Sequence, residues 1–149
     1  PDRFEAGTLN IPGILGLYAG LEWLKKTGIQ KIREHELMLT ERFIKGLKAI
    51  DPAGNKIRIV GKEGIQGRTG VVSIQTKKRE MAQTAYELDE RYGIMTRVGL
   101  HCAPSAHKTL GTYPDGTIRF SFGFWNTTEE VDSAVEAMGE LTEEIGDGV

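Results

Sequence analysis

Residues 11–50 carry their apolar side chains at a helical period. After residue 10 these side chains recur at steps of three and four: Ile14, Leu17, Leu21 and Leu24. Asn10 can cap such a helix, Pro12 suits its first turn, and Gly28 is a typical stop. A second, longer amphipathic stretch follows, and Asp51-Pro52 ends it. We therefore expect two helices that pack together as a hairpin.

After residue 56 the pattern changes to short runs of β-branched residues. The apolar residues of these runs are Ile57, Ile59, Val71, Val72 and Ile74. Glycines at positions 61, 64, 67 and 70 separate the runs, which predicts two strands joined by a glycine-rich turn. A phosphate-binding loop is disfavoured, because no Lys-Ser/Thr pair follows the glycines.

The second half of the chain alternates between helix and strand. The pattern predicts a helix at 79–92, a strand at 94–97, a loop at 98–116, a strand at 117–122 and a last helix that runs to Ile145. The long loop holds Cys102, and ordered loops of that length are usually functional. The Asn126–Glu129 stretch resembles a capping box for the last helix.

These elements give the order ααββαββα. Such an order predicts an α+β fold, in which a small sheet of about four strands is covered by helices. The length of 149 residues, with 39% hydrophobic content, suits one packed core.

The charge and cysteine content exclude several classes of function. The 19 basic and 21 acidic side chains give a net charge of −2, which is not the basic surface that binds a nucleic-acid backbone. No run approaches the roughly 20 apolar residues of a membrane span. The single cysteine cannot form an internal disulfide, which fits a reducing compartment. We expect a cytoplasmic protein that binds neither nucleic acid nor membrane.

Cys102 is the first candidate for chemistry. His101 precedes it and Arg97 lies close in sequence, and positive neighbours favour the thiolate, which is the nucleophilic form. Free cysteines are also among the most frequently buried residues, where they act as small apolar side chains. The residues alone leave both readings open. The chain has no Cys or His spacing that is typical of a zinc site.

Arg119 is the second candidate, because it interrupts an apolar strand. Its planar guanidinium suits a carboxylate held by two parallel hydrogen bonds, and an outward-facing position on the strand is the equal alternative. Lys108 follows His107, and this pairing resembles the setting of a lysine that binds pyridoxal phosphate. No acidic partner for a pyridine nitrogen is recognisable, so we interpret Lys108 as a solvated loop residue.

Four stretches together resemble one family, the class V aminotransferase-like cysteine desulfurases and the related selenocysteine lyases. In chain order they are Arg3–Thr8 with Asn10, Arg97–Ala103, Gly116–Ser121 and Trp125–Asp132. Their order and spacing follow the family over nearly the whole chain, which is far more specific than one motif. Leu100 departs from the family where many members have a second histidine, and Phe124-Trp125 replaces the usual tyrosine.

The resemblance implies the small C-terminal domain of a fold-type I enzyme that depends on pyridoxal phosphate. In that family the cysteine that matches Cys102 takes sulfur from L-cysteine, which leaves alanine and a persulfide on the enzyme. The resemblance assigns the substrate carboxylate to Arg119, with Arg97 and His101 beside it.

The same resemblance implies a cofactor contact and partners. Gly7 and Thr8 match a pair that reaches the cofactor phosphate across the interface of a homodimer. The substrate is then L-cysteine or selenocysteine, and the sulfur passes to an acceptor protein.

The family's Schiff-base lysine, its aspartate under the pyridine nitrogen and its ring-stacking residue precede the matching region and are not in this sequence. We therefore expect a piece of a longer protein that is inactive alone. Residues 1–10 then connect to the cofactor domain, and residues 11–149 form the small domain. Two other readings stay open: a related class V aminotransferase or lyase in which Cys102 is incidental, and a free-standing sulfur-carrier or interaction module.

Overall fold

The computed structural model describes residues 2–4, 6–62 and 64–143, and it has the predicted α+β architecture. A short 3-10 turn at Asp2–Phe4 comes first. The further elements are α1 (Ile11–Thr27), α2 (Ile29–Ile50), β1 (Ile57–Val60), β2 (Val71–Thr76), α3 (Met81–Tyr92), β3 (Arg97–Gly99), α4 (Pro104–Leu110), β4 (Thr117–Ser121) and α5 (Thr128–Glu143). The predicted end of the last helix at Ile145 lies outside the described residues.

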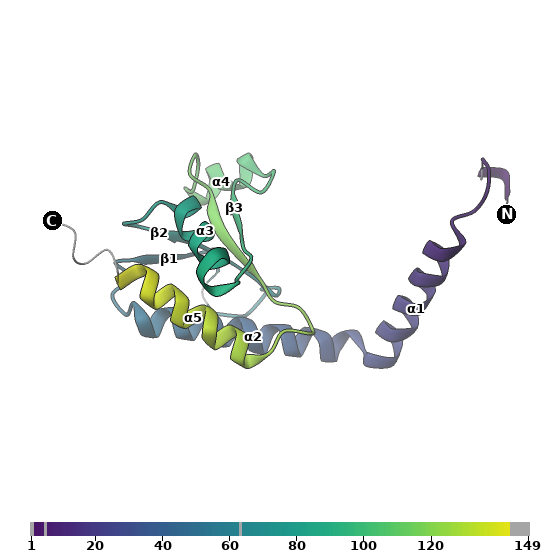
Figure 1. The fold of residues 1–149 in the computed structure, drawn as a ribbon, viewed down its shortest axis with the longest axis horizontal. Coiled ribbons are helices and arrows are strands. Elements are labelled where there is room, and N and C mark those ends of the chain that lie inside the picture. Colours follow the sequence, from purple (N-terminus) through teal and green to yellow (C-terminus); the bar gives the residue numbers. More distant parts are fainter. Residues whose placement is uncertain (1, 5, 63, 144–149) are drawn as a thin grey trace.

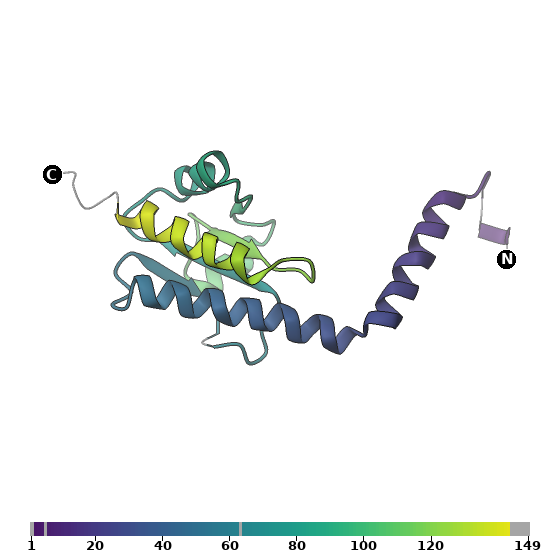
Figure 2. The same cartoon turned by 60° about the horizontal axis from the view of Figure 1, so that its bottom comes forward.

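The four strands form one antiparallel sheet in the order β1-β2-β4-β3. Side chains alternate between the two faces of a sheet, and one face here is apolar. Its central residues are Val72, Ile74, Ile118 and Phe120, all of them buried. The helices α2, α3 and α5 lie over this face, so the core sits between one helical layer and one side of the sheet (Figure 2).

The helices α2 and α5 pack side by side, and a glycine permits their close approach. A Cβ atom at Gly46 on α2 would lie 2.5 Å from Cγ2 of Val135 on α5. Arg42 and Asp132 close the same crossing with two hydrogen bonds of 2.6 Å. This ion pair is half exposed, so it contributes little to stability compared with the buried core between the helices.

The helix α1 leaves the rest of the molecule at Gly28 and projects as an arm (Figure 1). None of its residues is buried, and its large apolar side chains are exposed around much of the helix: Ile11, Ile14, Leu15, Leu17, Tyr18, Leu21 and Leu24. The predicted hairpin is therefore wrong. A helical period reveals an apolar side but not the surface against which that side packs. No helix in the described part of the chain is long and apolar enough to cross a membrane.

An aromatic cluster holds the end of this arm. The Trp23 ring lies 5.3 Å from the Phe124 ring and 5.5 Å from the Trp125 ring, measured between centroids. His35 on α2 lies against Phe124 and places its Nε2 atom 2.9 Å from the carbonyl oxygen of Asn126. The loop between β4 and α5 thus ties α1 to α2.

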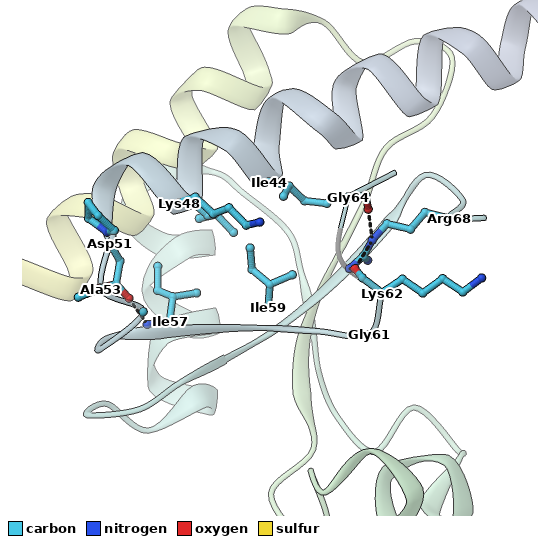
Figure 3. A pocket seen from close by; sticks show the side chains of 13 residues that line it. Ile44, Lys48, Asp51, Ala53, Ile57, Ile59, Gly61, Lys62, Gly64 and Arg68 are labelled. Atoms are coloured by element: carbon cyan, nitrogen blue, oxygen red, sulfur yellow. Dashed lines mark hydrogen bonds between the residues drawn. The ribbon is translucent and has the colours of Figure 1, made fainter. Parts of the chain in front are cut away.

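The glycine-rich segment between β1 and β2 is a turn, as predicted, and it is organised around Arg68. The buried Arg68 guanidinium donates to the carbonyl oxygens of Lys62 and Gly64. Beside it lies a hollow of about 450 Å³ whose walls include Ile44, Ile57 and Arg68 (Figure 3). This hollow borders β1, the edge strand farthest from β3, so it is separate from the loop that holds Cys102.

Residues 94–116 are divided differently from the prediction. β3 begins only at Arg97, so the strand predicted at 94–97 is wrong at its first three positions. The predicted loop at 98–116 contains the rest of β3 and the helix α4. Pro104 starts α4, and Gly111, with φ of 65°, ends it. Both residues are ordinary helix signals, but the helix between them is too short to show a clear apolar period.

The helix caps lie where the sequence predicts them, except that the cap of α5 is shifted by one residue. Asn10 accepts a hydrogen bond from the Gly13 N–H at 3.1 Å, as predicted. The capping box of α5 is formed by Thr127 and Glu130, one residue later than expected. Asn126 instead accepts a hydrogen bond from the Gly123 N–H at 2.8 Å.

The close crossing of α2 and α5 makes a prediction about two glycines. Gly46→Ala should lower the free energy of unfolding by about 1–3 kcal/mol, because the added methyl group displaces Val135. Gly139→Ala is the matched control, since its Cβ would meet Ile50 only at ordinary contact distance, and it should stabilise α5 by up to about 1 kcal/mol. Urea unfolding measures both changes. Equal effects of the two substitutions would contradict this packing.

Candidate functional site

The second face of the sheet is polar and carries two arginines side by side. The strand registers place Ser73 opposite Arg119, and Arg119 opposite Arg97. Directly opposed residues in an antiparallel pair lie about 4.5–5.5 Å apart at Cβ, and like charges in that position repel each other. The two guanidiniums therefore concentrate positive charge at β3 and β4, which suits an anion.

Arg119 has hydrogen-bonding capacity that the described residues do not use. Its Nε atom is buried and has no hydrogen-bond partner among them, and no ion pair is recorded for its side chain. A buried donor without a partner costs about 1–3 kcal/mol, more for a charged group. A planar carboxylate would accept from Nε and from a neighbouring guanidinium nitrogen at once. The alternative of an outward-facing, solvated arginine is therefore disfavoured.

Cys102 stands at the end of β3 in a tight turn with an unusual backbone. The Ala103 N–H donates to the Leu100 carbonyl at 2.9 Å, and the two residues between them, His101 and Cys102, have φ of 50° and 57°. Positive φ at both central positions is the arrangement that glycine and asparagine favour, and other residues adopt it at a cost. The thiol is exposed. The reading of Cys102 as a buried packing residue is therefore wrong.

A close approach of two glycines brings this turn onto β4. A Cβ atom at Gly116 would collide with the backbone of Gly99, the residue paired with Thr117. The φ of 80° at Gly116 also favours glycine. The contact sets the start of β4 directly beside the end of β3, so the turn and Arg119 belong to one site.

His101 is bound to the same strand. Its Nε2 atom lies 3.0 Å from Thr117 Oγ1, whereas its Nδ1 atom is buried with no partner among the described residues. Burial lowers the pKa of His101, and the nearby Arg119, His107 and Arg97 lower it further by repulsion. The imidazole is therefore neutral at pH 7 and able to accept a proton.

The helix α4 follows the turn and is linked to the sheet at its C-terminal end. Arg58 on β1 donates to the carbonyl oxygens of Leu110 and Gly111, at 2.9 and 3.3 Å, and so holds the end of α4. Lys108 is exposed and lies over the Tyr113 ring, which agrees with its interpretation as a solvated residue. His107, in contrast, is buried. The sequence analysis assigned it no role, because no apolar periodicity around it indicated burial.

The structure unites four of the six predicted site residues. Arg97 and Arg119 are paired across β3 and β4, His101 lies near both of them, and Cys102 follows His101 in the turn after β3. Gly7 and Thr8 do not join them. Both are exposed and belong to the segment before α1, which lies at the far end of the arm (Figure 1). Gly7 has φ of 123°, and nothing lies within 4 Å of the position that its Cβ would occupy.

Known proteins resemble this chain in sequence and in fold. The family described as Aminotransferase class-V matches residues 1–134. The chain belongs to that family. It is 37% identical over 145 residues to a probable cysteine desulfurase of Pyrococcus abyssi, and 36% identical over 146 residues to one of Methanothermobacter thermautotrophicus. Each alignment covers 97% of this chain and 34% of the relative, so the chain spans about a third of the length of these relatives.

Solved structures of cysteine desulfurases share the fold of this chain. An apo structure of a cysteine desulfurase from Thermococcus onnurineus matches with a TM-score of 0.84 and 35% identity, over 97% of this chain and 34% of that one. The cysteine desulfurase CsdA from Escherichia coli, in an S-sulfonic acid form, matches with a TM-score of 0.76 and 28% identity, over 97% of this chain and 33% of that one. These enzymes have the fold-type I architecture, and their family generally depends on pyridoxal phosphate.

The left-handed backbone at Cys102 predicts how two substitutions there change the stability of the protein. Cys102→Gly should be more stable than Cys102→Ala by roughly 0.5–1 kcal/mol, because glycine avoids a left-handed cost of about 1–2 kcal/mol and loses part of that gain through chain entropy. Thermal unfolding of both variants measures the difference. Ser105, on the right-handed helix α4, is the control, and there alanine should exceed glycine. The same order at both positions would contradict a left-handed Cys102.

Proposed function

We propose that this chain is the C-terminal domain of a cysteine desulfurase, which removes sulfur from L-cysteine and leaves alanine and a persulfide on Cys102. One observation carries the proposal. An exposed cysteine lies on a strained turn after β3, and the neighbouring strand carries an arginine whose buried Nε has no hydrogen-bond partner among the described residues. A carboxylate-bearing thiol compound matches both halves of that site.

Arg119 is the residue that would hold the substrate carboxylate. Its strand is central in the sheet, which fixes the backbone on both sides, and burial removes water from part of the guanidinium. Arg97 stands opposite it and adds positive charge without the same burial. The carboxylate end of the substrate is thereby fixed, which leaves its sulfur to meet the cysteine turn.

Cys102 would act as the nucleophile after its thiol loses a proton, and neutral His101 is the neighbouring group that can accept one. A sulfur–sulfur bond then forms between Cys102 and the substrate while the substrate's carbon–sulfur bond breaks. The electron pair of the broken bond stays with the carbon, which takes up a proton to give alanine. Exposure of the thiol leaves the resulting persulfide open to a sulfur-acceptor protein.

Pyridoxal phosphate, when bound, supplies the electron withdrawal that makes the carbon–sulfur bond of an amino acid breakable. Gly7 and Thr8 fit its phosphate chemically, because an open backbone and a hydroxyl group offer hydrogen-bond donors at an exposed place. Their distance along the arm from Cys102 suits a contact with a second subunit, so we propose a homodimer. We also propose a cytoplasmic location, in keeping with a single free thiol.

The role of Arg119 predicts a change in substrate affinity. In the full-length protein, Arg119→Lys should raise KM for L-cysteine by roughly 10- to 100-fold, because a charged hydrogen bond contributes about 1.5–3 kcal/mol. Steady-state alanine formation gives the value. Arg42→Lys is the matched control, since Arg42 binds Asp132 away from the site and should leave KM unchanged. An unchanged KM in Arg119→Lys would refute this role.

The nucleophile is tested by a conservative substitution. Cys102→Ser in the full-length protein should abolish persulfide and alanine formation while cofactor binding, followed by its visible absorbance, persists. Alanine formation at the wild-type rate would instead indicate a related lyase in which the cysteine is incidental.

A further inference from the structure

Two histidine rings lie together behind the cysteine turn. The centroids of the His101 and His107 rings are 5.7 Å apart, with 45° between the ring planes. Each ring has one nitrogen at a buried threonine: His101 Nε2 lies 3.0 Å from Thr117 Oγ1, and His107 Nδ1 lies 2.7 Å from Thr112 Oγ1. The function proposed above uses His101 but leaves His107 without a task.

The second ring is fixed from several directions. His107 is 5% exposed although it is a titratable residue on a short helix at the surface. Thr112 binds it through the side chain and, by a 2.9 Å bond from its backbone N–H, through the His107 carbonyl. Arg58 holds the end of the same helix to the sheet. Burial of a polar ring costs free energy unless its nitrogens are hydrogen-bonded, and Thr112 provides the partner for Nδ1.

The charges around the two rings disfavour a proton on His101. Arg119 on β4, Arg97 on β3 and His107 on α4 all oppose a positive charge on His101, and burial adds to their effect on its pKa. Like charges in contact repel each other, so a charge on the neighbouring ring disfavours the protonated form of His101. His107 therefore influences His101 both as a packing neighbour and as a potential like charge.

We propose that His107 is a positioning residue, which orients the His101 ring and keeps it neutral beside Arg119 so that it can accept the proton of Cys102. The transfer of the Cys102 proton to His101 rests on the proposed function, whereas the effect of His107 on His101 does not. With Nε2 engaged by Thr117, the buried Nδ1 of His101 is the nitrogen that remains without a partner among the described residues.

The test measures the titration of His101 by NMR in the 149-residue chain, which has only three histidines. His107→Asn retains a nitrogen that can reach Thr112 but removes the ionisable ring, so the pKa of His101 should rise. His35→Asn is the control, because His35 binds the Asn126 carbonyl on the opposite, helical side and should leave that pKa unchanged. Far-UV circular dichroism verifies the fold of each variant.

Two further variants cover the case in which His107→Asn fails to fold. Thr112→Val should release the His107 ring and change the ring-current shift of the His101 Cε1 proton, and Thr112→Ser should restore it. A folded His107→Asn protein with an unchanged His101 pKa would overturn the proposal. An equal shift in His35→Asn would do the same.

A second readout connects the pair to the thiol. The rate at which iodoacetamide alkylates Cys102 should follow the protonation of His101, and this inflection should move to higher pH in His107→Asn. No inflection shared with His101 would refute the link to Cys102. Alkylation uses neither cofactor nor L-cysteine, so its result bears on the histidine pair and not on the desulfurase reaction. A lack of desulfurase activity, in turn, would not alter the measured effect of His107 on His101.

Discussion

The pairing of β3 with β4 places two arginines opposite each other on one face of the sheet, and most of the site depends on this pairing. Arg97 and Arg119 repel each other, and the described residues provide no carboxylate that bonds to either. An arrangement that costs stability in a small domain is retained when it serves binding or chemistry. The same register brings the end of β3, and with it Cys102, to the start of β4.

The backbone around the pairing makes the site compact. Gly99 and Gly116 approach so closely that a side chain at the second position would collide with the first, and the turn that follows holds both His101 and Cys102 at positive φ. The Thr117 hydroxyl lies within hydrogen-bond distance of His101 Nε2. The proposed nucleophile and proton acceptor therefore lie in a short turn after β3, and the proposed carboxylate-binding arginine lies on the neighbouring strand β4.

Sequence reasoning recovered the parts of this arrangement that are local. Caps and breakers located the helix that begins after Asn10, and β-branched runs located β1 and β2, because these signals act within a few residues. The direction of α1 was missed, since it depends on Trp23 meeting Phe124 and Trp125, a contact between distant segments. The burial of His107 was missed for the same reason. The cysteine and the arginine were found by residue type and resemblance, whereas the pairing of Arg119 with Arg97 follows from strand register, which the sequence pattern did not specify.

The chain matches about a third of the length of its relatives, and its arm carries apolar side chains that nothing in the described residues covers. Cys102 is the residue proposed to take up the sulfur. The most direct measurement is the mass of the peptide that contains Cys102 after the full-length protein has been exposed to L-cysteine without reductant. A gain of one sulfur atom on Cys102 is predicted. Formation of alanine with no added sulfur on this peptide would contradict the account.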